Sequence, residues 1–443
     1  MTRNGGAPAL FTDLYELTML QAYVARGMTD TATFSLAVRK LPPERNLLIA
    51  AGLGTLLDDL ESLHFCADDL AYLRGLATFG DDFLDWLGRF RFSGRIDAMP
   101  EGTPVFAGEP ILEVTAPLPE AQLIETLVLN RIQLATLAAS KAVRVVHVAA
   151  GRKVVDFGAR RAHGIDAALE AARAFHIAGV GATSNVLAGQ RYGVAVAGTM
   201  AHSFVQAHDD EAAALRSFAG LYPETILLVD TYDTLDGVAK VIDLARELGD
   251  EFRVRGVRLD SGDLGDLAER SRRLLDAAGL ERVEIFASGG LDEAAIADLV
   301  GQGAPIDGFG VGTHMAVSRD VPALDIAYKL CAHVGRGRLK LATGKPVLPG
   351  RKQVFRQDGG DVIARADERL DGRPLLVEVM RDGKRLPAGR DDLETARERC
   401  RTALDALPAA IRGVAPADEP WPVAVSPALA DYDEQVRRAV AAG

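Results

Sequence analysis

Short apolar runs recur through the middle of the 443-residue chain. Each run is rich in Val, Ile, Leu or Phe, ends at polar or glycine residues, and in most cases precedes a helical spacing of apolar positions. Repetition of strand, loop and helix predicts parallel strands joined by crossover helices. Six or seven such units fit a barrel better than a short open sheet. The predicted strands are residues 153–157, 194–198, 225–229, 254–259, 283–287 and 306–310.

The first third of the chain has a different pattern. Residues 11–94 follow a mainly helical spacing of apolar positions. Residues 96–115 are β-prone and are interrupted by prolines and glycines, which predicts a small antiparallel set of strands. Residues 119–150 form a long apolar segment that is typical of a buried helix.

The last quarter of the chain is expected to return to the first domain. Strand-like segments occur at 354–355, 362–363 and 375–379, and residues 391–407 have the charged amphipathic pattern of a helix. The remainder, rich in Ala and Pro, is expected to wrap the surface. We therefore predict an N-terminal α+β domain (1–145), an α/β-barrel catalytic domain (146–350) and a C-terminal segment that packs on both (351–443).

Charge and cysteine content narrow the class of protein. The net charge of −12 disfavours a wide surface for nucleic acid or an anionic membrane, although it leaves room for a local basic pocket. Cys66, Cys331 and Cys400 stand singly, without the spacing of a disulfide framework or a zinc ribbon. The first ten residues lack a signal peptide's apolar stretch, and no run of roughly 18 apolar residues follows. We expect a cytoplasmic protein.

Chemically useful side chains follow the first two predicted strands, where barrel enzymes carry their reactive loops. Arg160 and Arg161 can meet a phosphate or a carboxylate with fork geometry, or simply be solvated. Thr199 is expected to cap a helix that has His202 in its first turn. A helix N-terminus disfavours the imidazolium and welcomes a phosphoryl group, so a neutral His202 is a candidate nucleophile. A hydrogen-bonded structural histidine is the alternative.

The later strand ends add carboxylates and glycines. Asp230 and Asp260 can hold ribose hydroxyls or Mg²⁺ on a diphosphate, or cap helices. Two glycine loops follow, whose backbone amides can approach a phosphate closely. A basic run over residues 319–352 offers cations for a triphosphate and a diphosphate, or forms a solvated face. The loops contain Ser288, Gly289 and Gly290 after the fifth strand, and Gly310, Gly312 and Thr313 after the sixth.

In this order, these motifs resemble those of nicotinate phosphoribosyltransferases. The resemblance implies an incomplete barrel of parallel strands, with an N-terminal α+β domain completed by C-terminal segments. It also implies a head-to-tail homodimer with shared active sites. Some members carry a four-cysteine zinc site near the C-terminus, which three lone cysteines cannot build. The segments that carry the resemblance are 12–19, 41–46, 156–164, 184–189, 198–205, 258–263 and 308–313.

The resemblance further implies a reaction. Nicotinate and phosphoribosyl pyrophosphate give nicotinate mononucleotide and pyrophosphate, the first step of NAD salvage from nicotinic acid. ATP hydrolysis is coupled to this step through phosphorylation of His202, and Mg²⁺ accompanies the diphosphate at Asp260.

Individual roles follow by position. Phe157 and Tyr15 would sandwich the pyridine ring, with Tyr15 contributed by the partner subunit. Arg258 would lie along the ring, and Arg160 near phosphate. His202, Arg258 and Asp260 would be catalytic, and Asp230 would face the ribose and metal. The remaining implied contacts are Ser184, Asn185, Ser288, Gly289, Gly290, Gly310, Gly312 and Thr313 for the substrates, and Arg319, Lys329 and Lys345 for the nucleotide phosphates.

One position bears on the choice between acid and amide. Related nicotinamide enzymes carry an Asp in place of Asn185, and a carboxylate there would repel nicotinate. The nearest alternatives are a nicotinamide or a quinolinate phosphoribosyltransferase. A phosphate-binding barrel lyase or isomerase would need a Lys or Glu base, whereas these strand ends offer Arg, Asp and His. A non-catalytic metabolite-binding protein is disfavoured by His202, Asp260 and both glycine loops.

Overall fold

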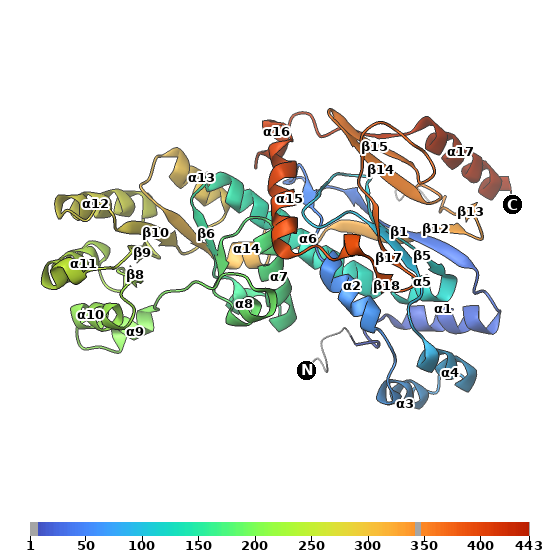
Figure 1. Ribbon diagram of the computed structural model, residues 1–443, viewed down its shortest axis with the longest axis horizontal. Coiled ribbons are helices and arrows are strands. Elements are labelled where there is room, and N and C mark those ends of the chain that lie inside the picture. Colours follow the sequence, from blue (N-terminus) through green and yellow to red (C-terminus); the bar gives the residue numbers. More distant parts are fainter. Residues whose placement is uncertain (1–7, 342–346, 443) are drawn as a thin grey trace. The chain divides into compact units, whose positions relative to one another are not determined.

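The computed structural model describes residues 8–341 and 347–442, which fall into two compact units (Figure 1). The first unit contains the chain up to Ser140 and from Ala323 onward, and the second contains Lys141–Pro322. The division lies inside the long helix α6 (Glu125–Val148). Each unit is built around its own sheet.

An antiparallel sheet forms the centre of the first unit. Strand β1 (Thr31–Lys40) pairs with β12 (Asp325–His333) on one side and with β5 (Pro110–Pro117) on the other. On the far side of β5, β3 (Arg95–Ala98) pairs with β17 (Val377–Arg381). The sheet therefore joins segments from the beginning, the last third and the end of the chain, as the returning C-terminal strands predicted. Its edge strands are β13 (Arg336–Gly337) and β18 (Lys384–Arg385).

A buried tyrosine shows how this sheet is packed. The ring of Tyr328 on β12 stacks on Phe34 of β1, with 5.0 Å between the ring centroids. Its hydroxyl donates a hydrogen bond of 2.7 Å to the Ala121 carbonyl on helix α5 (Leu118–Leu123). The apolar ring is thus buried while its one polar atom is satisfied, the arrangement that a buried tyrosine requires. The other helices of this unit are α1 (Leu14–Ala25), α2 (Leu53–Ser62), α3 (Ala67–Gly75), α4 (Asp81–Arg89), α15 (Leu393–Asp405), α16 (Ala409–Arg412) and α17 (Pro427–Ala442).

Strand β1 corrects the expectation that residues 11–94 are mainly helical. The strand is buried along most of its length, and β12 and β5 pair with its two edges. Its apolar residues Ala32, Phe34, Leu36 and Val38 alternate with Thr31, Thr33 and Ser35, so a strand signal was present in the sequence and was missed. The predicted strands of residues 96–115, the helix of 119–150 and the helix of 391–407 are confirmed. The unit also contains two smaller sheets. One consists of β2 (Leu48–Ile49) and β4 (Pro104–Val105). The strands of the other follow the order β16 (Arg373–Pro374), β14 (Lys352–Gln357), β15 (Gly360–Arg365) and β19 (Val423–Val425).

A curled parallel sheet, a half-barrel, forms the second unit. Among the described residues it has six strands in the order β7-β6-β11-β10-β9-β8, and every pairing is parallel. The predicted incomplete α/β barrel is confirmed. Because all strands run the same way, their carboxyl ends lie at one edge, where reactive loops collect. The strands are β6 (Lys153–Asp156), β7 (Ala182–Thr183), β8 (Ile226–Leu228), β9 (Gly256–Leu259), β10 (Glu284–Ser288) and β11 (Gly308–Val311).

One predicted strand of the barrel was placed wrongly. Residues 194–198 contribute only a single bridge, from Val196 to Thr183, and the neighbouring strand is β7. β7 contains only two residues, which follow Gly179 and Gly181 and are too few to give a periodic signal.

The second unit ends at Pro322, before the predicted boundary of the barrel domain at residue 350. The reason is that β12, which includes Lys329, forms long antiparallel pairings with β1 and therefore belongs to the first unit.

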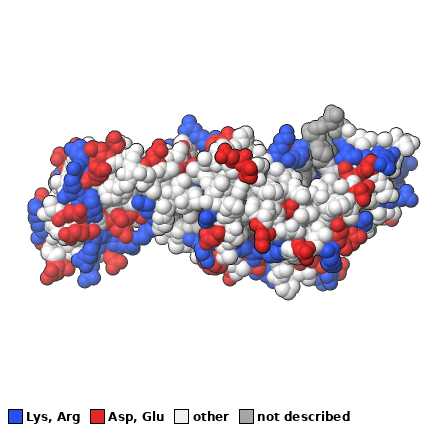
Figure 2. Space-filling view, turned by 90° about the horizontal axis from the view of Figure 1, so that it is seen from above, with Lys and Arg blue, Asp and Glu red and all other residues white. Residues whose placement is uncertain are grey.

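Charged side chains of both signs cover the second unit's helices. Figure 2 shows acidic and basic residues intermixed in the region of α11 (Thr234–Leu248) and α12 (Leu264–Ala277). On α12, Arg270 pairs with Asp266 and Arg272 with Asp276, each four residues apart. Such pairs stabilise an exposed helix modestly. Across residues 8–341 and 347–442, no helix is both long and apolar enough to cross a membrane.

Candidate active site

His202 lies at the carboxyl edge of the half-barrel, next to the ends of two strands. It opens the short helix α9 (His202–Gln206), which confirms the predicted first-turn position. Its Nδ1 lies 3.2 Å from the Thr231 hydroxyl after β8, and its Nε2 lies 3.6 Å from an Asp260 carboxylate oxygen after β9. The expected cap is wrong, because the N-cap is Ala201 and the Thr199 hydroxyl bonds the Met200 carbonyl instead.

Two aspartates tie three neighbouring strand ends together. Asp230 accepts hydrogen bonds from the Asp260 backbone N–H (2.9 Å) and from the Ser261 hydroxyl (2.6 Å) at one carboxylate oxygen. Asp260 in turn accepts a short hydrogen bond from Ser288 at the end of β10. The other Asp230 oxygen is buried and has no hydrogen-bond partner among the described residues. The carboxylates are therefore held rigidly, and one retains an oxygen for a ligand.

An aromatic ring and a guanidinium group stand together in the same mouth. The Arg258 guanidinium lies 5.7 Å from the centre of the Phe157 ring and donates a 3.0 Å hydrogen bond to the Met200 carbonyl. Burial lowers the pKa of Arg258, nearby Asp260 and Asp230 oppose that shift, and Arg160 adds to it. Arginine stays charged even so, and the group is a preformed cation beside an aromatic face. Phe157 and Arg258 line a small, mainly apolar cavity together with Thr199, Phe286 and Gly310.

Both predicted phosphate loops follow strands at this edge, and packing explains two of their glycines. Gly289 has a φ of +91°, and a Cβ there would lie 1.9 Å from the Asp260 carbonyl oxygen. At Gly310, a Cβ would lie 2.3 Å from a ring carbon of Phe157. The glycines therefore let the strand ends and the ring approach one another. Gly290, Gly312 and Thr313 complete the loops, and Thr313 opens the short helix α14 (Thr313–Ala316).

Ser184 and Asn185 lie between β7 and helix α8 (Val186–Tyr192). The Ser184 backbone N–H donates to the Asp156 carbonyl at 2.8 Å. Asn185 is the N-cap of α8, and its side-chain oxygen accepts a 3.2 Å hydrogen bond from the Ala188 backbone. Ser184 is thus fixed to the end of β6, directly before Phe157, and Asn185 is fixed to the start of α8.

Some of the predicted site residues lie outside the second unit. Tyr15, on α1, is about half exposed (47%), and Lys329, on β12, lies 3.2 Å from Glu125 within the first unit. Lys345 lies outside the described residues. The remaining predicted residues, Arg160 on a 3₁₀ turn (Ala159–Arg161) and Arg319 after α14, belong to the second unit.

The structure adds residues that the sequence analysis did not assign. Asp156 is buried, and accepts hydrogen bonds from the Gly158 backbone (2.7 Å) and the Thr183 hydroxyl (2.6 Å). Burial raises the pKa of its carboxyl, and these hydrogen bonds counter the shift. Its position at a strand end was a usable signal, as was that of Thr231. The role of the Met200 carbonyl could not be predicted from sequence, because every residue has a backbone carbonyl and only the fold shows which one faces Arg258.

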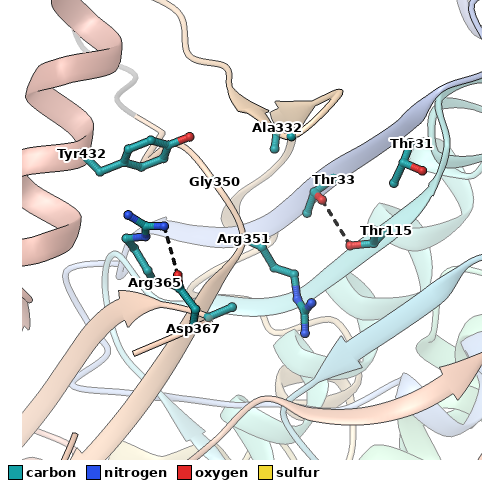
Figure 3. Close-up of a pocket in the computed structure, with 11 residues that line it drawn as sticks. Thr31, Thr33, Thr115, Ala332, Gly350, Arg351, Arg365, Asp367 and Tyr432 are labelled. Carbon is teal, nitrogen blue, oxygen red and sulfur yellow. Dashed lines mark hydrogen bonds and ion pairs between the residues drawn. The ribbon is translucent and has the colours of Figure 1, made fainter. Parts of the chain in front are cut away.

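A larger pocket, of about 420 Å³, lies in the first unit (Figure 3). Thr33 and Thr115 lie on one side, with 3.2 Å between their hydroxyls, and Tyr432 lies beside Arg365 on another. Its arginines already face carboxylates, with Arg365 3.1 Å from Asp367 and Arg351 3.4 Å from Asp97. None of the predicted site residues lines this pocket.

A resident metal centre would need several ligands close together. Within the described residues, no group of three or more His, Cys, Asp or Glu side chains is arranged to hold a metal ion. A cation that arrives with a diphosphate needs fewer protein ligands, because the substrate supplies oxygens of its own.

Comparisons with known proteins first define the class. A crystal structure of human nicotinic acid phosphoribosyltransferase superposes with a TM-score of 0.85 at 28% identity, covering 96% of this chain and 99% of that one. A family profile for the nicotinate phosphoribosyltransferase N-terminal domain matches residues 10–133, and one for the nicotinate phosphoribosyltransferase family matches residues 152–369. The half-barrel with its strand-end site is thus that of a phosphoribosyltransferase.

Sequence relatives define the family. Nicotinate phosphoribosyltransferase pncB2 of Mycobacterium tuberculosis is 54% identical over 97% of this chain and 94% of its own length. Nicotinate phosphoribosyltransferase of Bacillus subtilis is 42% identical over 83% of this chain and 78% of its own. The chain belongs to the nicotinate phosphoribosyltransferase family.

Proposed function

We propose that this chain joins nicotinate to phosphoribosyl pyrophosphate, forming nicotinate mononucleotide and pyrophosphate in the salvage of nicotinic acid to NAD. One observation carries the proposal. His202 lies beside Asp260, and Asp260 links the ends of β8, β9 and β10 through Asp230 and Ser288. An imidazole, two carboxylates and a glycine loop are thus held together at the edge where a phosphorylated sugar is expected to bind.

The proposed chemistry depends on charge and position. Departure of pyrophosphate leaves an oxocarbenium-like ribose, so the reaction needs positioning and charge stabilisation more than a strong base. Asp230 and Asp260 supply negative charge for the ribose. The Phe157 ring offers a face on which the pyridine ring can stack. The Arg258 guanidinium, 5.7 Å from the centre of the Phe157 ring, offers a cation for the carboxylate of nicotinate.

The residues fit a Mg²⁺ ion that accompanies the diphosphate. Asp230 has a buried oxygen without a hydrogen-bond partner in the described part of the chain, and the Asp260 carboxylate is about one-third exposed (35%). Carboxylate oxygens are the ligands that a hard divalent cation prefers. When bound, Mg²⁺ would neutralise charge on the leaving diphosphate. Asp260 would hold it, and Asp230 would face it with its unpartnered oxygen while the other oxygen keeps Asp260 in place.

ATP coupling through His202 is supported by the surroundings of the imidazole. Thr231 lies within hydrogen-bond distance of Nδ1. If Nδ1–H donates to this hydroxyl, the Nε2 lone pair is free to attack the γ-phosphorus of ATP, and ADP leaves. Arg319 is our candidate for contact with the nucleotide phosphates, as are Lys329 and Lys345.

A head-to-tail homodimer would complete the site. Phe11, Leu14 and Tyr15 at the start of α1 expose 44%, 59% and 47% of their surface, an apolar group of the kind that marks a protein interface. In the proposed dimer, this group reaches the partner's half-barrel and Tyr15 covers the pyridine ring opposite Phe157. The three free cysteines suit the reducing cytoplasm in which we place the enzyme.

The decisive experiment is incubation with ATP labelled at the γ-phosphate. We expect acid-labile, base-stable label on the wild-type protein and none on His202→Ala, while His208→Ala, a histidine bonded to the Phe204 carbonyl in the same unit, keeps the label. Label on the His202 variant would contradict the phosphohistidine. Side-by-side turnover of nicotinate, nicotinamide and quinolinate tests the substrate, and preference for either of the latter two would favour the rival enzymes.

A further inference from the structure

His314 connects the two glycine loops. It is the second residue of α14, directly after the loop that contains Gly312. Its Nδ1 lies 3.3 Å from an oxygen of Asp292, which follows the Gly289-Gly290 loop. The other Asp292 oxygen caps helix α13 (Glu293–Gly301) through the backbone N–H groups of Ala294 and Ala295, at 3.0 and 2.9 Å. One carboxylate therefore holds a helix start with one oxygen and an imidazole with the other.

The second ring nitrogen of His314 faces Arg319. The distance from Arg319 Nη1 to His314 Nε2 is 3.0 Å. A guanidinium can only donate, so Nε2 accepts and carries no proton, and Nδ1–H is left to donate to Asp292. The chain turns back sharply to make this contact, because Ser318 has a φ of +42° and the Arg319 backbone N–H bonds the His314 carbonyl at 3.2 Å. Such a strained, buried residue persists only where its surroundings enforce it.

A second bridge runs parallel to the first, one residue further along each segment. The buried Lys141 contacts Glu293, next to Asp292, and lies 2.8 Å from Asp320, next to Arg319. Arg144 also binds Glu293, at 2.9 Å. Burial alone would raise the pKa of Glu293, but the hydrogen bonds from Lys141 and Arg144 lower it. The Lys141 side chain is only 3% exposed, whereas that of His314 is 21% exposed, so the outer bridge is the one that solvent protons reach.

We propose that His314 is a positioning residue that must be neutral to work. It aims Arg319 toward the phosphate groups of the substrates and fixes the spacing of the two glycine loops, so that acidification weakens phosphate binding. The inference rests on the proposed function for the role of Arg319 and of the loops. It assigns to His314 a duty that is separate from that of His202.

The physical reason is the loss of an acceptor. A proton on Nε2 removes the hydrogen bond from Arg319 and places two positive charges 3.0 Å apart. Asp292 faces the other side of the ring and keeps its contact with Nδ1. The 3₁₀ turn Ala159–Arg161 packs against α14, and a Cβ on its N-cap residue Gly158 would lie 2.4 Å from that of Ala316. Its charged residues, Arg160 and Arg161, add positive charge. Arg319 is therefore released from its position as His314 gains a proton.

The test compares His314→Gln and His314→Ala with wild type by calorimetric titration of phosphoribosyl pyrophosphate at pH 8 and pH 6. Glutamine offers one acceptor and one donor and cannot gain a proton. At pH 8 we expect binding within about twofold of wild type for His314→Gln, and weaker by about three- to tenfold for His314→Ala. From pH 8 to pH 6, wild type should lose at least about threefold more affinity than His314→Gln. The ligand's own protonation cancels in that ratio.

Steady-state kinetics separate positioning from a general structural role. The KM for phosphoribosyl pyrophosphate and ATP should rise in His314→Ala while the KM for nicotinate stays unchanged, and His208→Gln should behave as wild type. Identical pH dependence in wild type and His314→Gln would overturn the inference even if the alanine variant fails to fold. Nitrogen-15 NMR of the free protein tests it without any ligand, since a His314 protonated on Nε2 at pH 8 would also overturn it. Absence of nicotinate turnover by wild type would instead count against the proposed function.

Discussion

The side-chain oxygen of Asn185 caps a helix, and its side-chain nitrogen is available to contact a ligand. Its side-chain oxygen caps α8 by accepting from Ala188, and the amide nitrogen has no role in the cap. Aspartate is as good an N-cap as asparagine, so Asn185→Asp should preserve the helix while it adds a negative charge to the loop. The substitution therefore tests electrostatic selection with little structural disturbance.

The expected result is a change in substrate preference. Asn185→Asp should lower kcat/KM for nicotinate relative to nicotinamide by about tenfold or more, because a carboxylate near the pyridine carboxylate is repulsive. Activity on both pyridines in parallel assays gives the ratio, and Asn185→Ser, another good cap without charge, is the matched control. An unchanged ratio in the aspartate variant would show that Asn185 does not face the pyridine carboxylate.

At the scale of elements, α1 is fastened to α6 by one buried carboxyl group. Glu16 accepts hydrogen bonds from the Thr126 backbone (3.1 Å) and hydroxyl (2.9 Å) at the start of α6, and contacts the Thr12 hydroxyl before α1. Burial raises the pKa of Glu16 to about 7, although the hydrogen bonds from Thr12 and Thr126 lower it. The same helix turn presents Tyr15, so the fastening of α1 sets where that ring lies.

A raised pKa in the folded state makes stability depend on pH. The folded chain holds the Glu16 proton more tightly than the unfolded chain, so this stabilisation is complete below the ordinary glutamate pKa and is lost as pH rises to about 7. We expect wild type to lose on the order of 2 kcal/mol relative to Glu16→Gln between pH 4.5 and pH 8. Urea unfolding of both proteins at several pH values measures the difference. Parallel curves for the two proteins would contradict it.

The elements also show how far sequence patterns reach. Strands β6, β9, β10 and β11 were predictable, because each is a short apolar run that ends at glycine or polar residues. β1 was missed although its apolar and polar residues alternate, and β7 was not predictable, since two residues give no period. The strand-end positions of Asp230 and Asp260 followed from the runs of β8 and β9, whereas the run that precedes His202 contributes only a single bridge. Contacts such as that of Arg258 with the Met200 carbonyl, or of His314 with Asp292 and Arg319, link segments whose spacing only the fold determines.

At the scale of the whole molecule, the two units divide the predicted site between them. Phe157, His202 and Asp260 belong to the second unit, whereas Tyr15 and Lys329 belong to the first. In the proposed head-to-tail dimer, each active site combines the second unit of one subunit with Tyr15 from the other. A closed two-fold dimer contains two such sites, and each site draws on both chains.

Mixed dimers test this arrangement directly. Tyr15→Ala and His202→Ala should each be strongly impaired alone. In a heterodimer of the two variants, one site carries both substitutions and the other carries neither, so that second site is intact. Random pairing on co-expression makes about half of the dimers heterodimers, so turnover of nicotinate should recover to about a quarter of the wild-type value per site.

The control pairs two substitutions that fall in the same half of each site. Asp260→Ala and His202→Ala both lie in the second unit, so every site of their heterodimer carries one defect, and co-expression should restore nothing. Recovery in the first mixture but not in the second requires that Tyr15 acts across the interface. Differential tags verify that heterodimers form in both mixtures. If neither mixture then recovers activity, Tyr15 and His202 of the same chain must lie in one site. In that arrangement each substitution disables the site of its own subunit, and the heterodimer has no intact site.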